Sequence, residues 1–221
     1  MTIRVWQGEY GQFQLAAILQ PHAATILCVA RLSDTLFCSS AADGLIKVSD
    51  LTGVVQHTLT GHTDWVWQVL PLADDELVSA SEDGTLKRWN WRLGTCTGTI
   101  ATGLPPVHAL LFDSAQNRLI CGNQAGELQV WQRSPDGQGW RLAYSVLAHR
   151  GIVRTLAWVA DGQLASGGED NKVKIWNLAA GHCEQEMTHA DFVQSVAWLS
   201  ARRQLISASY DGALKVWPLA G

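Results

Sequence analysis

The sequence predicts an all-β fold built from about five copies of a four-stranded antiparallel unit. Three observations support this prediction. Two short sequence markers recur along the whole chain, and both recur with a period of about 42 residues. Between the markers, apolar and polar residues alternate as they do in half-buried strands, and no segment keeps a helical period.

The composition is typical of a well-packed globular protein. The 221 residues are 47% hydrophobic and only 16% charged, which is the reverse of the balance found in disordered chains. The net charge is −4, whereas a protein that binds the phosphate backbone of nucleic acid generally has an excess of positive charge. No apolar run reaches the roughly 18–20 residues of a membrane-spanning helix, and residues 1–10 lack a signal-peptide pattern. We therefore expect neither nucleic acid nor a membrane as a partner.

The cysteines and histidines predict neither a disulfide framework nor a metal site. Five cysteines are an odd number, and none forms a CxxC pair, so a reducing, cytoplasmic setting is expected. The adjacent His182 and Cys183 point to opposite faces of their predicted strand. The sequence also lacks GxxxxGK[ST], GxGxxG and GxSxG motifs, so we expect no cofactor.

The first marker is a tight turn followed by a strand that ends in tryptophan. Its five copies occupy residues 41–49, 81–89, 123–131, 168–176 and 209–217. Ser49 replaces the tryptophan in the first copy, and Ala125 replaces the turn aspartate in the third. The copies end 40, 42, 45 and 41 residues apart.

The second marker is a histidine ahead of an alternating apolar stretch, at positions 22, 62, 103, 149 and 189, where the third copy has Gly103 instead. Both markers therefore define the same repeats. The repeats cover approximately residues 8–50, 51–90, 91–132, 133–177 and 178–217. Around the second pair of markers, the four strands are expected near residues 64–70, 76–81, 85–90 and 95–100.

With these markers at this period, essentially the whole chain resembles the WD40 repeat family. The residue after the tryptophan position is aspartate only at Asp50. The resemblance implies a β-propeller, in which four-stranded antiparallel blades surround a central channel. It also implies a buried, hydrogen-bonded tetrad of histidine, serine or threonine, aspartate and tryptophan in each blade.

Three repeats match the tetrad completely. The matching residues are His62, Ser79, Asp83, Trp89; His149, Ser166, Asp170, Trp176; and His189, Ser207, Asp211, Trp217. The first repeat has His22, Ser39 and Asp43 but lacks the tryptophan. The third has Gly103, Cys121 and Ala125 before Trp131, so no network is expected there.

An Asp-His-Ser set also suggests a hydrolase triad, but the repetition favours a structural role. A nucleophile must be accessible and is needed once, whereas this set recurs beside a tryptophan. A buried aspartate requires a hydrogen-bonding partner, and an imidazole N–H supplies it. The serine hydroxyl then bridges the imidazole to the indole N–H.

The strand count leaves two architectures open. Two strands precede four full sets of four, and three more follow, which makes 21 strands. Residues 2–6 look like a leftover strand of a preceding repeat. Residues 12–19 look like an outer strand, which in this family would complete the blade of residues 192–217 and close a five-bladed ring. The alternative is an incomplete or open propeller, or a fragment of a longer one, whose free edges favour self-association or a complementing chain.

The resemblance further implies that partners bind the channel face. The positions involved are three and five residues after the histidine, and the one before the turn aspartate. We call these the docking positions. Here they are rich in aromatic residues and include an arginine, the residue types of binding hot spots. The candidates are Trp65, Trp67, Glu82, His108, Arg154, Glu169, Phe192, Gln194 and Tyr210. Glu82 and Glu169 would suit a lysine or arginine of a ligand.

We therefore expect a non-catalytic scaffold or adaptor that binds a peptide or protein on this aromatic face. One alternative is a regulatory or sensor portion of a larger multidomain protein. A second is an enzyme with its active site in the channel. The enzyme is disfavoured because the sequence offers no titratable cluster outside the repeated tetrads.

Overall fold

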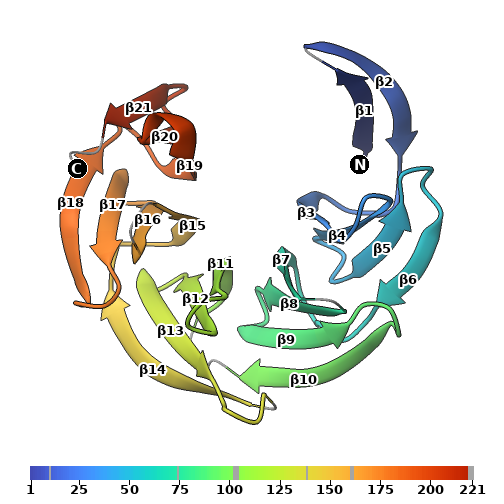
Figure 1. The fold of residues 1–221 in the computed structure, drawn as a ribbon, viewed down its shortest axis with the longest axis horizontal. Coiled ribbons are helices and arrows are strands. Elements are labelled where there is room, and N and C mark those ends of the chain that lie inside the picture. The colour runs from blue at the N-terminus through green and yellow to red at the C-terminus, as the bar shows by residue number, and fades with distance from the viewer. Residues whose placement is uncertain (10, 74, 102–104, 138, 160–161, 219–221) are drawn as a thin grey trace. The chain divides into compact units, whose positions relative to one another are not determined.

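The computed structural model describes all residues except 10, 74, 102–104, 138, 160–161 and 219–221. Over these described residues it has 21 strands in six antiparallel sheets, which are drawn in Figure 1. The chain divides into two compact units, Met1–Pro106 and Val107–Gly221, and each is described by itself. The strand content and the antiparallel sheets confirm the predicted all-β fold.

The first unit contains a two-stranded sheet and two four-stranded sheets. Its strands are β1 (Ile3–Glu9), β2 (Gln12–Leu19), β3 (Ile26–Arg31), β4 (Leu36–Ala41), β5 (Ile46–Asp50), β6 (Val55–Leu59), β7 (Val66–Ala73), β8 (Glu76–Ser81), β9 (Thr85–Asn90) and β10 (Thr95–Ala101). β1 pairs with β2, and the two four-stranded sheets, β3–β6 and β7–β10, follow chain order. We call these two sheets blades 1 and 2.

The second unit contains two four-stranded sheets and one three-stranded sheet. Its strands are β11 (Val107–Asp113), β12 (Arg118–Asn123), β13 (Glu127–Arg133), β14 (Trp140–Leu147), β15 (Val153–Trp158), β16 (Gln163–Gly168), β17 (Lys172–Asn177), β18 (His182–Thr188), β19 (Val193–Leu199), β20 (Gln204–Ser209) and β21 (Leu214–Pro218). A single turn of 3-10 helix, η2 (Ser200–Arg202), joins β19 to β20. Sheets β11–β14, β15–β18 and β19–β21 are blades 3, 4 and 5.

The strands predicted around the second pair of markers are β7 to β10, and β8 and β9 match their predicted bounds. β7 begins two residues later than expected and runs on to Ala73. The alternation of apolar and polar residues in the sequence therefore predicted the strands of this blade to within a few residues.

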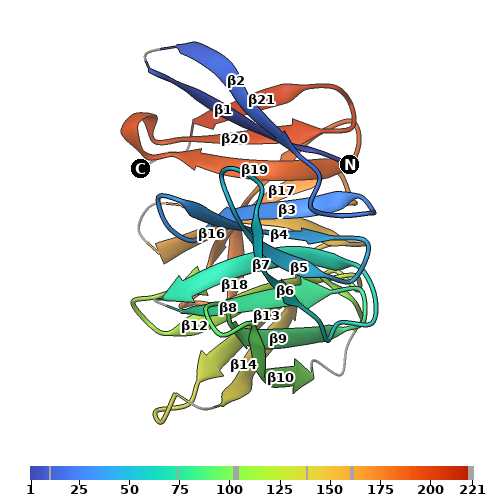
Figure 2. The same ribbon diagram turned by 90° about the vertical axis from the view of Figure 1, so that its right-hand side faces the viewer.

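The pairing of residues 12–19 differs from the closed-ring expectation. β2 pairs with β1 from Leu19 opposite Ile3 to Gln12 opposite Glu9, and the sheet of blade 5 has three strands. Figure 2 shows β1 and β2 running side by side as a long hairpin. A short turn containing Gly11 joins the two strands, so their pairing closes a far smaller loop than pairing with a strand near the other end of the chain. The segment 2–6 therefore has a partner within its own unit.

The second strands of blades 1 to 4 are almost entirely buried. In β4, β8, β12 and β16 the last five residues are all buried. Leu77 and Trp89 of blade 2 share a core with Leu59 of blade 1, and Ile120 of blade 3 shares one with Trp176 of blade 4. Blade-to-blade packing of this kind is the source of stability in repeat proteins.

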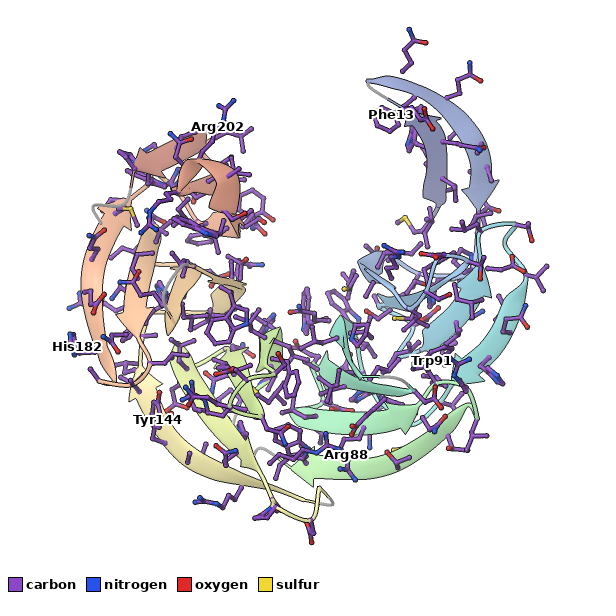
Figure 3. All side chains as sticks on the ribbon, in the orientation of Figure 1. Phe13, Arg88, Trp91, Tyr144, His182 and Arg202 are labelled. Carbon is purple, nitrogen blue, oxygen red and sulfur yellow. The ribbon has the colours of Figure 1, made fainter. Side chains whose placement is uncertain are left out.

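Hydrogen bonds between side chain and backbone add to this packing. The Tyr144 hydroxyl on β14, labelled in Figure 3, donates to the Leu178 carbonyl oxygen at 2.8 Å. The Trp158 indole N–H on β15 donates to the Phe112 carbonyl oxygen at 3.0 Å. These bonds tie blade 3 to blade 4. Among the described residues there is no helix long and apolar enough to cross a membrane.

The turn between β12 and β13 depends on a glycine. Gly126 has a φ of +84°, and its carbonyl oxygen accepts from the backbone N–H groups of Ala148 and His149. A Cβ at Gly126 would lie 2.0 Å from the His149 carbonyl oxygen. Gly212, in the corresponding turn of blade 5, has a similar φ of +78°, but no atom of the described residues lies within 4 Å of such a Cβ.

We predict that Gly126→Ala lowers the free energy of unfolding more than Gly212→Ala does. Both substitutions place an alanine in the left-handed backbone conformation, which costs about 1–2 kcal/mol. Only Gly126→Ala also brings a Cβ into collision with a backbone atom. Urea unfolding of the two variants and the wild type measures the difference. Equal losses in the two variants would show that the close contact at Gly126 is relieved without penalty.

Candidate functional site

Three blades contain the complete tetrad. In blade 4, His149 Nδ1 lies 2.7 Å from Asp170 Oδ1, and His149 Nε2 lies 2.7 Å from Ser166 Oγ. The Trp176 indole N–H donates to the same hydroxyl at 2.9 Å. The equivalent distances in blades 2 and 5 run from 2.6 to 3.0 Å. With the imidazole proton on Nδ1, the serine hydroxyl donates to Nε2 and accepts from the indole, so all four groups are satisfied.

The tetrads are structural and contain no accessible nucleophile. Ser79, Ser166 and Ser207 are all 0% exposed. A serine that attacks a substrate must reach it, and these hydroxyls instead join the second and third strands of each blade to the residue that enters the first. The geometry therefore supports the structural interpretation of the repeated Asp-His-Ser set.

The tetrad aspartates are held ionised. Burial opposes ionisation of Asp170, but hydrogen bonds from His149 and from the backbone N–H groups of Arg150 and Lys172 outweigh it and lower its pKa to about 2. The pKa of Asp83 is also lowered to about 2, because hydrogen bonds from Thr85 and His62 outweigh the same burial.

The two incomplete networks differ from each other. In blade 1, His22 contacts Asp43 and Ser39, but Ser49 at the tryptophan position is buried and its Oγ has no hydrogen-bond partner among the described residues. Here the missing tryptophan interrupts the network, as predicted.

Blade 3 has Cys121 and Ala125 at two tetrad positions, and its tryptophan is hydrogen-bonded within its own strand instead. The Trp131 indole N–H donates to Gln129 Oε1 on the same strand at 3.2 Å, and Gln129 Nε2 is buried without a hydrogen-bond partner among the described residues. Residues two apart on a strand share a face, and the other tryptophan-bearing blades have lysine at this position, Lys87 for example. That exchange of lysine for glutamine was the signal in the sequence. Gly103 lies outside the described residues.

We predict that Ser166→Ala destabilises the protein more than Ser39→Ala does. Removing the Ser166 hydroxyl leaves both His149 Nε2 and the Trp176 N–H buried without a partner, at about 1–3 kcal/mol for each group. Removing the Ser39 hydroxyl leaves only His22 Nε2 without a partner, because blade 1 has no tetrad tryptophan. Thermal and urea unfolding of both variants measure the difference, and an equal loss would argue against the indole bond as a stabilising contact.

In the first unit, three docking positions form a compact patch, which we call the tryptophan patch: Trp65, Trp67 and Glu82. The two indole rings lie 5.5 Å apart between centroids, at an interplanar angle of 60°. The Trp67 indole N–H donates to Glu82 Oε2 at 2.7 Å. Trp65 is 46% exposed, so a large aromatic surface faces solvent at this end of blade 2.

In the second unit, the docking positions of blades 4 and 5 are also paired. Arg154 Nε donates to Glu169 Oε1 at 3.0 Å and forms an ion pair with it. Phe192 and Tyr210 meet edge to face, with centroids 6.4 Å apart, and Tyr210 is 63% exposed. We call these four residues the mixed patch.

His108 and Gln194 lie deeper than the sequence suggested. His108 is only 9% exposed, and burial together with the nearby positive charge of Arg154 lowers its pKa to about 4. The Nε2 atom of Gln194 is buried without a hydrogen-bond partner among the described residues. His108 lies in a run of β11, residues 107–110, in which both faces of the strand are buried, and Gln194 is partly buried beside the buried Val193 on β19.

The low pKa of His108 predicts a specific loss of stability in mild acid. The unfolded histidine titrates near 6.5 and the folded one near 4, so the unfolded state takes up the proton first as the pH falls. His108 therefore lowers the free energy of unfolding progressively between about pH 6.5 and pH 4.

The measurement is urea unfolding of His108→Gln across this range, with His182→Gln, on exposed β18, as the control. We expect a flatter pH dependence for His108→Gln only. Identical profiles for the wild type and His108→Gln would contradict the assignment.

The described residues hold no group of three or more histidine, cysteine, aspartate or glutamate side chains placed to bind a metal ion. All five cysteines are free thiols, and burial raises the pKa of Cys38 to about 12. The chemistry of the docking positions is thus that of aromatic contact, hydrogen bonds and charge.

Repeated antiparallel blades of four strands, or of three in blade 5, define a β-propeller repeat protein, and three of these blades contain the complete internal tetrad. The family model described as "WD domain, G-beta repeat" matches residues 53–90, 140–177 and 181–218, about half of the chain. The chain therefore belongs to the WD40 repeat family, which confirms the resemblance inferred from the markers.

Relatives and a solved structure agree with this assignment. The DENN domain and WD repeat-containing protein SCD1 of Arabidopsis thaliana is 24% identical over 97% of this chain, which covers 18% of the relative. The ribosome biogenesis protein WDR12 homolog of Trichoplax adhaerens is 24% identical over 98% of this chain and is covered over 58% of its length.

The solved WD40 β-propeller domain of Doa1 superposes with a TM-score of 0.78 at 20% identity. The match covers 90% of this chain and 65% of that one, and at this identity it shows the fold. The chain thus spans less than two thirds of the length of each of these relatives.

Proposed function

We propose that the protein is a non-catalytic interaction module that binds a peptide or protein surface at its docking positions. The observation that carries the proposal is the exposure of paired aromatic rings at docking positions in both units. Trp65 is 46% exposed beside Trp67, and Tyr210 is 63% exposed beside Phe192. Each ring is held by a neighbouring ring, so little side-chain freedom is lost when a partner covers it.

The polar groups of the patches support the same function. Aromatic residues and arginine dominate binding hot spots, and the carboxylates of Glu82 and Glu169 lie within hydrogen-bonding distance of such residues. A partner that covers the rings also meets charged groups that fix its orientation. We propose no catalytic role, because the repeated serine hydroxyls are fully buried.

A second candidate function is a regulatory or sensor portion of a larger multidomain protein. It is favoured by the short span of this chain relative to its relatives, 18% of SCD1 for example. Under this proposal the same docking positions bind a neighbouring domain or a complementing chain. The same proposal includes self-association through blade edges, because β21 is an edge strand of its sheet.

We also propose a cytoplasmic setting. The five free thiols, two of them fully buried (Cys38 and Cys121), suit a reducing compartment. Protein or peptide is the proposed class of partner, and neither nucleic acid nor a membrane is proposed.

We predict that Trp67→Ala and Tyr210→Ala each reduce capture of a specific partner by about tenfold or more, because truncated hot-spot residues cost about 2 kcal/mol or more. The measurement is affinity capture from cell lysate, with bound proteins identified by mass spectrometry and then tested as purified partners. Leu93→Ala is the control, because Leu93 is 71% exposed and lies in the β9–β10 turn, away from the docking positions.

Circular dichroism and thermal unfolding establish that each variant is folded. Unchanged capture by both folded aromatic variants would refute the proposed function.

A further inference from the structure

A cavity of about 400 Å³ in the second unit is lined by the end of β14 in blade 3 and by β17, β18 and their flanking turns in blade 4. Its lining includes three cations and two carboxylates, which are Arg150, Lys172, Lys174, Asp170 and Glu186. Leu147 adds an apolar side chain that is 70% exposed. None of these residues is a docking position, so the cavity is a separate feature of the surface.

The tetrad of blade 4 fixes the backbone of two of these cations. Asp170 Oδ2 accepts from the Arg150 backbone N–H at 3.1 Å, and Asp170 Oδ1 accepts from the Lys172 backbone N–H at 3.2 Å. His149, directly before Arg150, contacts the same carboxylate, and its backbone N–H donates to the Gly126 carbonyl oxygen at 2.9 Å. A ligand that contacts Arg150 and Lys172 therefore meets a backbone that is already ordered.

The tetrad itself does not need positive charge at these two positions. Arg150 follows the tetrad histidine, and Lys172 is the second residue after the turn aspartate. The equivalent residues are Thr63 and Thr85 in blade 2, and Ala190 and Ala213 in blade 5. Their backbone N–H groups donate to the turn aspartates in the same way, at 2.9 to 3.1 Å. The charges of Arg150 and Lys172 are therefore additions to a network that forms equally well without them.

The carboxylates of the cavity do not compensate all of its cations. Lys172 and Lys174 share the carboxylate of Glu186, with Lys174 Nζ 2.9 Å from Glu186 Oε1. No carboxylate of the described residues pairs with the Arg150 guanidinium. Glu186 raises the pKa of Lys172, whereas the nearby positive charge of Arg150 opposes this rise. With Asp170 ionised, three positive charges meet two negative ones, and an anion would be attracted to the Arg150 side of the cavity.

We propose that this cavity binds an oxyanion carried by a partner peptide, either the carboxylate of an acidic residue or the phosphate group of a phosphorylated one. This inference rests on the proposed function and names a further contact for the same partner. The oxyanion lies between the Arg150 guanidinium and the Lys172 ammonium, because a guanidinium can donate two parallel bonds to such a group. A neighbouring apolar residue of the peptide covers the exposed Leu147. Glu169 of the mixed patch directly precedes Asp170, so one peptide can contact both sites.

The experiment compares four probes on the full chain. Three are peptides of the sequence acetyl-Ala-Leu-X-Ala-Ala-amide, in which X is phosphoserine, glutamate or serine, and the fourth is inorganic phosphate. Binding is followed by NMR through the backbone N–H signals of Arg150 and Lys172. We expect at least one anionic peptide to bind about fivefold or more tightly than the serine peptide. The preference between the two anionic peptides distinguishes a phosphate from a carboxylate as the source.

Two outcomes with these probes would overturn the inference. Equal binding of all three peptides would show that the cavity does not recognise the charge. Inorganic phosphate that binds as tightly as the better anionic peptide would show that the peptide contributes nothing to binding.

Charge-removing variants test the position of the oxyanion. Arg150→Thr and Lys172→Thr introduce the residue type that blade 2 has at the same positions, so the tetrad bonds are kept. We expect each to weaken binding of the better anionic peptide by about threefold or more. Arg141→Thr is the matched control, because Arg141 is exposed on β14 and does not line the cavity. An equal loss in Arg141→Thr would show that only the overall charge of the protein matters.

Glu186→Gln tests the same site with the opposite sign. Glu186 competes with the ligand for Lys172 and Lys174, so its neutralisation is expected to strengthen binding of the better anionic peptide by about threefold or more. Damage to the fold would weaken binding instead, and thermal unfolding establishes that the variant is folded. Unchanged or weaker binding by folded Glu186→Gln would contradict the proposed position of the oxyanion.

The outcome separates this inference from the proposed function. If Trp67→Ala and Tyr210→Ala reduce partner capture while neither anionic peptide binds more tightly than the serine peptide, the interaction role stands and oxyanion recognition is refuted. If both folded aromatic variants capture partners as the wild type does, the interaction role of the docking positions is itself refuted.

Discussion

A carboxylate placed inside a β-blade is stable only if donors surround it, and this requirement organises the molecule. In blade 4, Asp170 receives bonds from His149 and from two backbone N–H groups, and Ser166 carries the chain of bonds onward to Trp176. The network joins the residue entering the first strand to the second strand, the tight turn and the third strand. It therefore sets the register of the blade, and with it the ends of the strands where the docking positions lie.

Much of the network and of the strand arrangement was predictable from the sequence, because the two sequence markers contain the residues that form the network. His62, Asp83 and Trp89 appear at fixed spacings, and the strands between them follow from simple alternation. The local pairing of β1 with β2 was not predicted, because a repeat pattern identifies the type of strand and leaves its neighbour open. The hydrogen bond from Trp131 to Gln129 in blade 3 was missed because Gln129 belongs to no family position.

The candidate site was predictable in position but less so in exposure. Trp65 and Tyr210 occupy surface positions, whereas His108, chosen by the same rule, is nearly buried. Blade 3 lacks both the histidine and the turn aspartate that define the rule, so counting from its markers is least reliable there. Pairings such as that of Trp67 with Glu82 depend on the cross-strand register, which the sequence pattern alone does not specify.

Blade 3 has the weakest internal network of the second unit, and much of its order comes from its neighbour. The hydroxyl of Tyr144 and the indole of Trp158 anchor it to blade 4, whose own tetrad is complete. In a linear array of repeats, the interface between two adjacent repeats contributes to the stability of both. Blade 4 thus stabilises blade 3 through their shared interface. A partner that binds only blade 4 and makes it more rigid therefore also suppresses local unfolding of blade 3.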